Sequence, residues 1–319
     1  MSAKLTDFMA VDKNSTAILG KLLYFSLADI LIEREKLEDI CQAMSLPVTL
    51  GKRLSPIDSF RRATTAIKQS SHAKANTGRP YKVYCRDNER ASSSISRELV
   101  KETLGTSTNR YKKLANIALD KVSEVMSYEV SDFDGEVDTY SLMAKAEENY
   151  ALYKRCAGLS QIESMVEGFL AQMDSTKISI HGRLYFVPRK HESMVNLFED
   201  FIGEIDRHNL NNGSITVNSI YMADDEKQRS KMANEFLSST RSEIQFYLAK
   251  VDHLISTGCE SLIIIDRWLN RIHALEAKKR MYEDILRTDL SNLGEEYENL
   301  RFMADELSAR AIMAVKKSA

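Results

Sequence analysis

Hydrophobic positions near the start of the chain recur at intervals of three and four residues, the spacing of one face of an α-helix. Within residues 14–33 this face carries Ile18, Leu19, Leu22, Leu23, Leu27, Ile30 and Leu31. A shorter apolar stripe over residues 35–45 stops before Pro47. The following segment opens with Ser55, Pro56 and Asp58, a combination typical of a helix N-terminus. The pattern therefore predicts an N-terminal helical region over residues 1–70.

The hydrophobic period changes after "SSHAKANTGRP", a polar stretch that marks a domain boundary. Tyr81, Val83 and Cys85 alternate with polar residues and predict a strand, ended by a turn at "DNER". Residues 112–130 fit either a helix or two strands around "KVSE", and their Val, Ile and Tyr content favours the hairpin.

Two further patterns complete the central segment. Residues 139–173 read as a helical insertion, and residues 178–222 read as strand, helix and strand, which predicts a β-α-β unit. We therefore expect residues 71–223 to form a central domain around a small mixed sheet.

From residue 224 the pattern is helical to the end of the chain. Apolar residues follow a seven-residue register at Ile272, Leu286, Leu293, Leu300 and Leu307, as in a helix that packs along a partner helix. A single helix of about sixty residues would measure about 90 Å at 1.5 Å per residue, and Gly294 or "SNLG" is the point at which it could be interrupted. The expected fold is thus α+β and predominantly helical, and residues 224–319 form a long helical hairpin or coiled-coil-like arm.

This arm predicts an assembly contact, because an isolated helix cannot bury an apolar stripe by itself. The residues expected to make the contact, here called the heptad stripe, are Leu286, Leu293, Tyr297, Leu300 and Leu307. A homo-oligomer or a complex with a foreign protein follows from this interpretation.

Composition sets the class of protein. With 319 residues, of which 43% are hydrophobic, the chain can bury a substantial core. Its four cysteines form no CxxC pair, so neither a disulfide framework nor a cysteine zinc site is predicted. No apolar run is long enough for a signal peptide or a membrane span. We expect a soluble cytoplasmic protein without a membrane partner.

The net charge of −2 conceals two blocks of opposite sign. Residues 51–121 contain sixteen Lys and Arg against six Asp and Glu, whereas residues 122–151 contain one Lys against eight Asp and Glu. The candidates for polyanion binding in the basic block are Lys52, Arg53, Arg61, Arg62, Lys68, Lys74, Arg79 and Lys82. The block either contacts nucleic acid or is balanced by the acidic block that follows it.

Catalytic and metal-binding motifs are incomplete. "LIIIDR", residues 262–267, resembles a Walker B strand, but no phosphate-binding loop accompanies it. "DFDGEVD" resembles a calcium loop, yet Val137 and Met143 stand where an EF-hand needs Gly and Glu, so a solvated turn is the better interpretation. His181 and His191 could lie close together but lack a third ligand. We predict no catalytic residue, no metal and no cofactor.

The stretch "GRLYFVP", Gly182 to Pro188, followed by an amphipathic helix and a second strand, resembles an uncharacterised family of proteins encoded by phages and plasmids. The resemblance covers about residues 80–310. The family has no established activity, so no functional residue carries over. What the resemblance implies is a viral or mobile-element context, in which proteins without catalytic signatures are often binders, including inhibitors of host defence enzymes.

The expected function is that of a non-enzymatic, oligomerising protein that binds a protein partner in the host cytoplasm, such as a host defence enzyme. The alternative is a nucleic-acid-binding accessory protein that uses the basic segment over residues 52–113.

Overall fold

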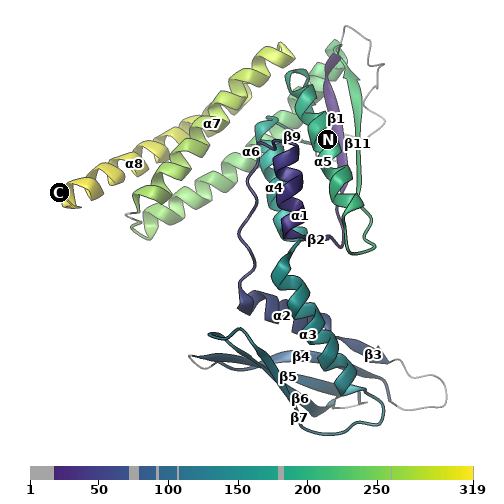
Figure 1. Cartoon of the computed structure of the whole chain (residues 1–319). Coiled ribbons are helices and arrows are strands. Elements are labelled where there is room, and N and C mark those ends of the chain that lie inside the picture. The colour runs from purple at the N-terminus through teal and green to yellow at the C-terminus, as the bar shows by residue number, and fades with distance from the viewer. Residues whose placement is uncertain are drawn as a thin grey trace. The chain divides into compact units, whose positions relative to one another are not determined.

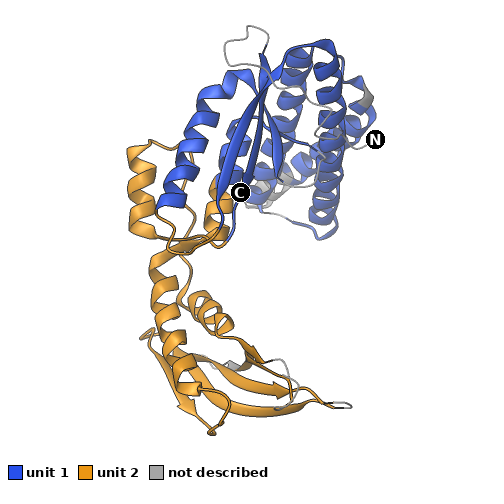
Figure 2. Ribbon diagram, turned by 90° about the vertical axis from the view of Figure 1, so that its right-hand side faces the viewer, with its two compact units in different colours: residues 1–28, 166–207, 214–319 blue, residues 29–165, 208–213 orange. Residues whose placement is uncertain are grey.

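The computed structural model describes residues 18–71, 79–90, 93–105, 108–178, 183–259 and 261–318. The chain divides into two units, shown in blue and orange in Figure 2. Unit 1 contains residues 1–28, 166–207 and 214–319, and unit 2 contains residues 29–165 and 208–213. The units therefore do not follow the boundaries predicted near residues 70 and 223. Helix α4 (Leu159–Gln172) runs across the division between them.

Unit 1 is built on a four-stranded antiparallel sheet in the order β11-β1-β10-β9. Its strands are β1 (Ile18–Ser26), β9 (Thr176–Lys177), β10 (Leu184–Pro188) and β11 (Thr216–Ala223). Strand β1 pairs antiparallel with both β10 and β11, so those two strands are parallel to each other with β1 between them. Together with α5 (Glu192–Arg207) they form the predicted β-α-β unit, but one strand lies inside it.

The helix predicted over residues 14–33 is wrong, because residues 18–26 form the strand β1, while residues 14–17 lie outside the described ranges. Leu22 faces the helices near the C-terminus and Leu23 lies on the opposite face, so both faces of the strand are buried. A strand that is buried on both faces reads as a continuous apolar run, which periodicity cannot distinguish from a buried helix. A Cβ atom at Gly20 would lie 2.2 Å from the Val187 carbonyl oxygen, so this position requires glycine.

Helices cover both faces of this sheet. On one face, α5 buries Phe198 against Phe25 and Phe169, and Lys21 donates a hydrogen bond of 2.9 Å to Asn196 of the same helix. On the other face the core continues into α6 (Glu226–Ser256), α7 (Leu262–Leu286) and α8 (Gly294–Ser318). These three helices run side by side in Figure 1.

The predicted coiled-coil-like arm is wrong. Residue Arg287 adopts a left-handed conformation with φ of 52°, and a 3-10 turn follows at Ser291–Leu293, so α7 and α8 are separate helices that pack on each other and on α6. The whole heptad stripe lies in the core of unit 1, with Leu286, Leu293, Leu300 and Leu307 fully buried. The five residues of the stripe are therefore covered within one chain. The helix that packs along the heptad stripe is α6 of the same chain.

Unit 2 contains a five-stranded antiparallel sheet in the order β3-β4-β5-β6-β7. Its strands are β3 (Gln69–Ser71), β4 (Tyr81–Arg90), β5 (Ser94–Thr103), β6 (Arg110–Asp120) and β7 (Met126–Val130). The β6-β7 hairpin confirms the two strands favoured for residues 112–130. The predicted turn at "DNER" is wrong, since β4 extends to Arg90. The predicted mixed sheet is also wrong, because the three sheets of the described chain pair their strands antiparallel.

The sequence pattern did not predict strand β5, because two charged residues lie on its buried face. Arg97 donates hydrogen bonds to the hydroxyls of Thr64 at 2.8 Å and Thr65 at 2.9 Å, and its guanidinium pairs with Asp87. Lys101 is buried further along the same face. With charges at these positions, the alternation of apolar and polar residues that marks a half-buried strand is lost.

One face of this sheet is covered by α2 (Pro56–Ala66) and α3 (Thr139–Arg155), as Figure 1 shows. Helix α2 is confirmed with its predicted cap, since the Ser55 hydroxyl accepts a hydrogen bond from the Asp58 amide at 3.1 Å. Unit 2 also contains α1 (Arg34–Ala43) and the strand pair β2 (Leu31–Glu33) and β8 (Cys156–Gly158). Within the described residues 18–71, α1 and α2 are the helices that remain of the predicted N-terminal helical region. None of the helices in the described ranges has the length and hydrophobicity needed to cross a bilayer.

Replacing Leu300 by Ala should lower the free energy of unfolding of unit 1 by about 2–5 kcal/mol, because a fully buried leucine leaves a cavity. Phe302→Ala is the matched control: its side chain is 73% exposed on the same helix, and the expected change is below about 0.5 kcal/mol. Urea unfolding followed by the fluorescence of Trp268, the single tryptophan of the chain, measures both. A Leu300→Ala protein that unfolds normally but changes its oligomeric state would show that the stripe lies between subunits.

Candidate functional site

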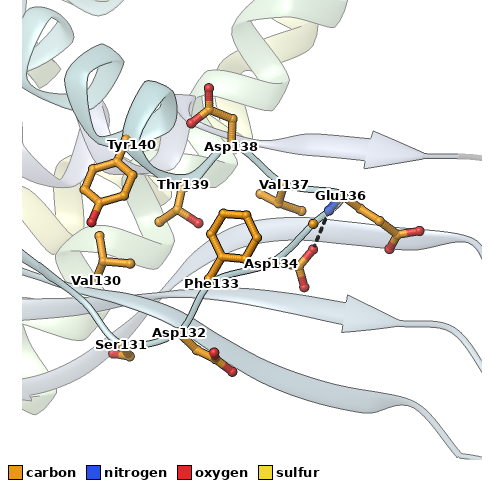
Figure 3. A pocket seen from close by; sticks show the side chains of 11 residues that line it. Val130, Ser131, Asp132, Phe133, Asp134, Glu136, Val137, Asp138, Thr139 and Tyr140 are labelled. Carbon is orange, nitrogen blue, oxygen red and sulfur yellow. Dashed lines mark hydrogen bonds between the residues drawn. The ribbon is translucent and has the colours of Figure 1, made fainter.

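A cavity of about 640 Å³ opens in unit 2 between the end of β7 and the start of α3. It is lined by residues 130–140, and Figure 3 shows their side chains. We call it the aromatic pocket, and residues 131–138 the acidic loop. The volume lies within the usual range of ligand-binding sites, about 300–1,000 Å³.

Local hydrogen bonds shape the acidic loop. An Asp134 carboxylate oxygen accepts the Glu136 amide at 3.1 Å, which closes a tight turn and is drawn as a dashed line in Figure 3. The Asp138 carboxylate accepts the Ser141 amide at 3.0 Å and caps the N-terminus of α3. Aspartate suits both positions because its short side chain reaches the backbone two or three residues ahead.

A buried lysine fastens the loop to the sheet. Lys101 of β5 is 6% exposed and donates hydrogen bonds to Asp134 at 2.9 Å and to Glu136 at 2.5 Å. Its ammonium group lies 4.4 Å from the centre of the Tyr81 ring, and the Tyr81 hydroxyl donates to the Glu136 carbonyl oxygen at 3.1 Å. The lysine therefore connects two loop carboxylates to the core of the sheet.

A second lysine holds the other end of the loop. Lys112 of β6 pairs with Asp132 at 3.1 Å and with Asp134 at 3.5 Å, and it donates to the Phe133 carbonyl oxygen at 2.8 Å. The interpretation of "DFDGEVD" as a solvated turn is confirmed, since Asp132, Phe133 and Glu136 are exposed. The sequence did not show that ion pairs attach this turn to two strands. Among the described residues no cluster of three or more His, Cys, Asp or Glu is arranged to hold a metal ion.

These ion pairs shift the titration of both partners. Burial by itself would raise the pKa of Asp134, but the hydrogen bonds from Lys101 and the Glu136 amide, with the charges of Lys101 and Lys112, hold the pKa below its usual value. Burial would lower the pKa of Lys101, yet its bonds to Asp134 and Glu136 raise it above the ordinary lysine value. Both groups are therefore ionised at neutral pH.

Two exposed aromatic side chains flank the pocket. Phe133 is 83% exposed within the acidic loop, and Tyr140 is 62% exposed in the first turn of α3. Thr139 lies between their rings in Figure 3. It is 5% exposed, and its hydroxyl oxygen is buried without a hydrogen-bond partner. Sequence reasoning missed these residues, although a phenylalanine inside an acidic turn was an available signal.

The predicted polyanion-binding residues do not gather on one face. Lys52 and Arg53 precede α2, Lys68 follows it, and Arg79 precedes β4. Arg61 and Arg62 lie on α2 itself, where Arg62 stacks 4.7 Å from the Tyr153 ring. Lys82 alternates with the buried residues Tyr81 and Val83, so it points to the sheet face opposite α2. Lys74 lies outside the described residues.

The sheet face opposite α2 carries charges that are already paired. Glu98 accepts hydrogen bonds from Arg86 and pairs with Lys113 at 2.9 Å, and these contacts lower its pKa. Glu102 accepts a hydrogen bond of 3.0 Å from the Tyr111 hydroxyl. The basic side chains on this face are therefore largely neutralised by neighbouring strands.

The predicted pair of histidines is not shown. His191 lies in unit 1, where its Nε2 atom is 2.8 Å from an Asp174 carboxylate oxygen that also pairs with Lys190 at 3.0 Å. His181 falls outside the ranges that the structure describes. His191 thus shares one carboxylate with Lys190 and has no second metal-ligating side chain paired with it among the described residues.

The fold and the site define an α+β protein that has an antiparallel sheet in each unit and an aromatic pocket in unit 2. The chain belongs to a family of unknown function (DUF6744), whose model matches residues 18–315. The resemblance to an uncharacterised family is confirmed at that level. No curated protein and no solved structure matches the chain.

Replacing Lys101 by Met should destabilise unit 2 at neutral pH and weaken the dependence of its stability on acid. The lowered pKa of Asp134 contributes stability above its unfolded pKa, about 3.9, and this is lost as the pH falls through the lower folded value. Without Lys101 the folded-state pKa of Asp134 rises toward its unfolded value, so this carboxylate contributes less stability at neutral pH and less is lost as the pH falls. Lys82→Met, on the exposed face of β4, is the control. Hydrogen exchange of β5 and β6 between pH 3 and pH 7 measures the difference, and coincident profiles for the two variants would contradict it.

Thr139→Val should stabilise unit 2 by about 1 kcal/mol, because it removes a buried hydroxyl without a partner and keeps the shape of the side chain. Thr64→Val is the matched comparison, since the Thr64 hydroxyl accepts from Arg97 and donates to the Phe60 carbonyl oxygen at 2.7 Å, so its loss should destabilise. Slower exchange of β5 and β6 amides is expected for Thr139→Val and faster exchange for Thr64→Val. Equal destabilisation by both would show that the Thr139 hydroxyl has a partner.

Proposed function

We propose that this chain is a non-enzymatic binding protein that holds a protein partner at the aromatic pocket of unit 2. The observation that carries the proposal is the exposure of Phe133 and Tyr140 on either side of a cavity whose loop is fixed by buried ion pairs. Aromatic residues are enriched in protein interfaces and supply large contact areas at low entropic cost.

The rigidity of the loop supports this proposal. An exposed phenylalanine on an unconstrained loop would lose conformational freedom on binding, at a cost in affinity. Here the backbone of Phe133 is held by Lys112 at its carbonyl oxygen, and the next residue, Asp134, is held by Lys101. The two lysines therefore present the aromatic side chain on a prearranged backbone.

The pKa values of three cysteines support a role other than nucleophilic catalysis. Burial raises the pKa of Cys85 to about 12, and it also raises the pKa of Cys41 and Cys156. A thiol acts as a nucleophile in its thiolate form, which a raised pKa disfavours. The dispersion of the basic residues over two faces of unit 2 likewise favours a protein partner over the nucleic-acid alternative.

The proposal retains the wider context that the resemblance implied: a protein of a phage or mobile element that acts in the host cytoplasm, with a host defence enzyme among its possible partners. It does not use the heptad stripe for self-association, because that stripe lies in the core of unit 1.

Site-specific photo-crosslinking tests the proposal. A photoreactive phenylalanine analogue placed at Tyr140 should crosslink one discrete host protein in cells, and the same analogue at Val122 should not. Val122 is a suitable control because it is 86% exposed in unit 2 outside the residues that line the pocket. The identified protein, once purified, should bind the native chain at least about tenfold more tightly than the Phe133→Ser variant, since a buried interface aromatic contributes 1.4 kcal/mol or more. Equal crosslinking from both positions would contradict the proposal.

A further inference from the structure

We infer that the aromatic pocket receives a cationic side chain of the partner, and that its chemistry favours the guanidinium group of arginine. The inference rests on the proposed function and adds to it the chemical class of the group that is recognised. Three independent features of the described pocket lead to it: uncompensated negative charge, exposed aromatic rings and a buried hydroxyl without a partner.

The charge of the pocket is not balanced by its lysines. Four carboxylates line it, on Asp132, Asp134, Glu136 and Asp138, and the cations in contact with them are Lys101 and Lys112. Asp134 is occupied by both lysines, whereas the side chains of Asp132 and Glu136 remain 60% and 57% exposed. The excess of acid over base attracts a positively charged group, and exposed carboxylates can still accept hydrogen bonds from it.

The aromatic rings select a particular kind of cation. A guanidinium is planar and weakly hydrated, so it stacks on aromatic faces while its edge donates hydrogen bonds to carboxylates. Phe133 and Tyr140 provide the rings, and Asp132 and Asp138 are carboxylates of the same pocket lining. An ammonium group also binds acids, but it presents no flat surface to a ring.

The Thr139 hydroxyl provides a third contact. It is buried without a hydrogen-bond partner, and its oxygen can accept a hydrogen bond from an N–H donor. A buried polar group without a partner is unfavourable, so a ligand that satisfies it gains affinity. Because the oxygen is shielded from solvent, exposed side chains of the pocket lining must change rotamer when the ligand enters. Rotamer changes of exposed side chains are fast, on the order of picoseconds to nanoseconds.

An NMR titration with a defined probe tests the inference. Nα-acetyl-arginine methylamide, added to the full-length protein labelled with nitrogen-15, should shift the amide signals of residues 132–140. The citrulline counterpart has nearly the same shape without the charge and should bind at least about tenfold more weakly. The acetylated lysine amide should fall between the two, because it keeps the charge without the planar group.

Variants assign the contacts. Thr139→Val should weaken binding of the arginine probe severalfold, and Phe133→Ser with Tyr140→Ser should abolish it. Val122→Ser should leave binding unchanged, because that side chain is exposed outside the pocket lining. Equal shifts with arginine and citrulline, or arginine-induced shifts confined to residues around Glu98 and Glu102, would overturn the inference.

The outcome separates this inference from the proposed function. A partner that crosslinks at Tyr140 while the arginine probe leaves residues 132–140 unshifted would overturn cation recognition and leave protein binding in place. A selective response to arginine without any crosslinked partner would contradict the proposed function and support the chemistry of the pocket.

Discussion

The ion-pair cluster around Lys101 is the interaction on which the candidate site depends. A lysine buried in a sheet is costly unless its charge is matched, and here Asp134 and Glu136 match it. In return the two carboxylates fix the acidic loop against β5, and Lys112 fixes the same loop against β6. The aromatic pocket exists because the loop between β7 and α3 is held in one conformation by charges that originate in the sheet.

The two units solve the problem of burying apolar surface in different ways. In unit 1, helices pack on both faces of the sheet, so that β1 is covered by α5 on one side and by α6 to α8 on the other. In unit 2, α2 and α3 cover one face, and cross-strand pairs such as Glu98 with Arg86 and Lys113 occupy the other. A face stabilised by polar pairs does not require further covering, which leaves unit 2 with surface available for contacts.

Each error of sequence interpretation has a physical cause. The run of apolar residues in β1 was read as a helix because burial on both faces removes the alternation typical of a strand. Arg97 and Lys101 concealed β5 because charged residues occupy its buried face. The heptad stripe was read as an intermolecular contact, but its register does not specify which helix covers it, and α6 of the same chain does so.

Signals in adjacent residues were enough to predict several local elements. These are the capped helix α2, the β6-β7 hairpin, α5 with its amphipathic face, and the helical character of residues 224–319. The sequence also showed opposite charge blocks that could neutralise each other. Only the tertiary structure decided that Lys101 and Lys112 meet the acidic loop, because these partners are separated by 20 to 35 residues and are joined by strand pairing. The pocket with Thr139, Phe133 and Tyr140 follows from that pairing, since its shape depends on where the ends of β7 and α3 are held.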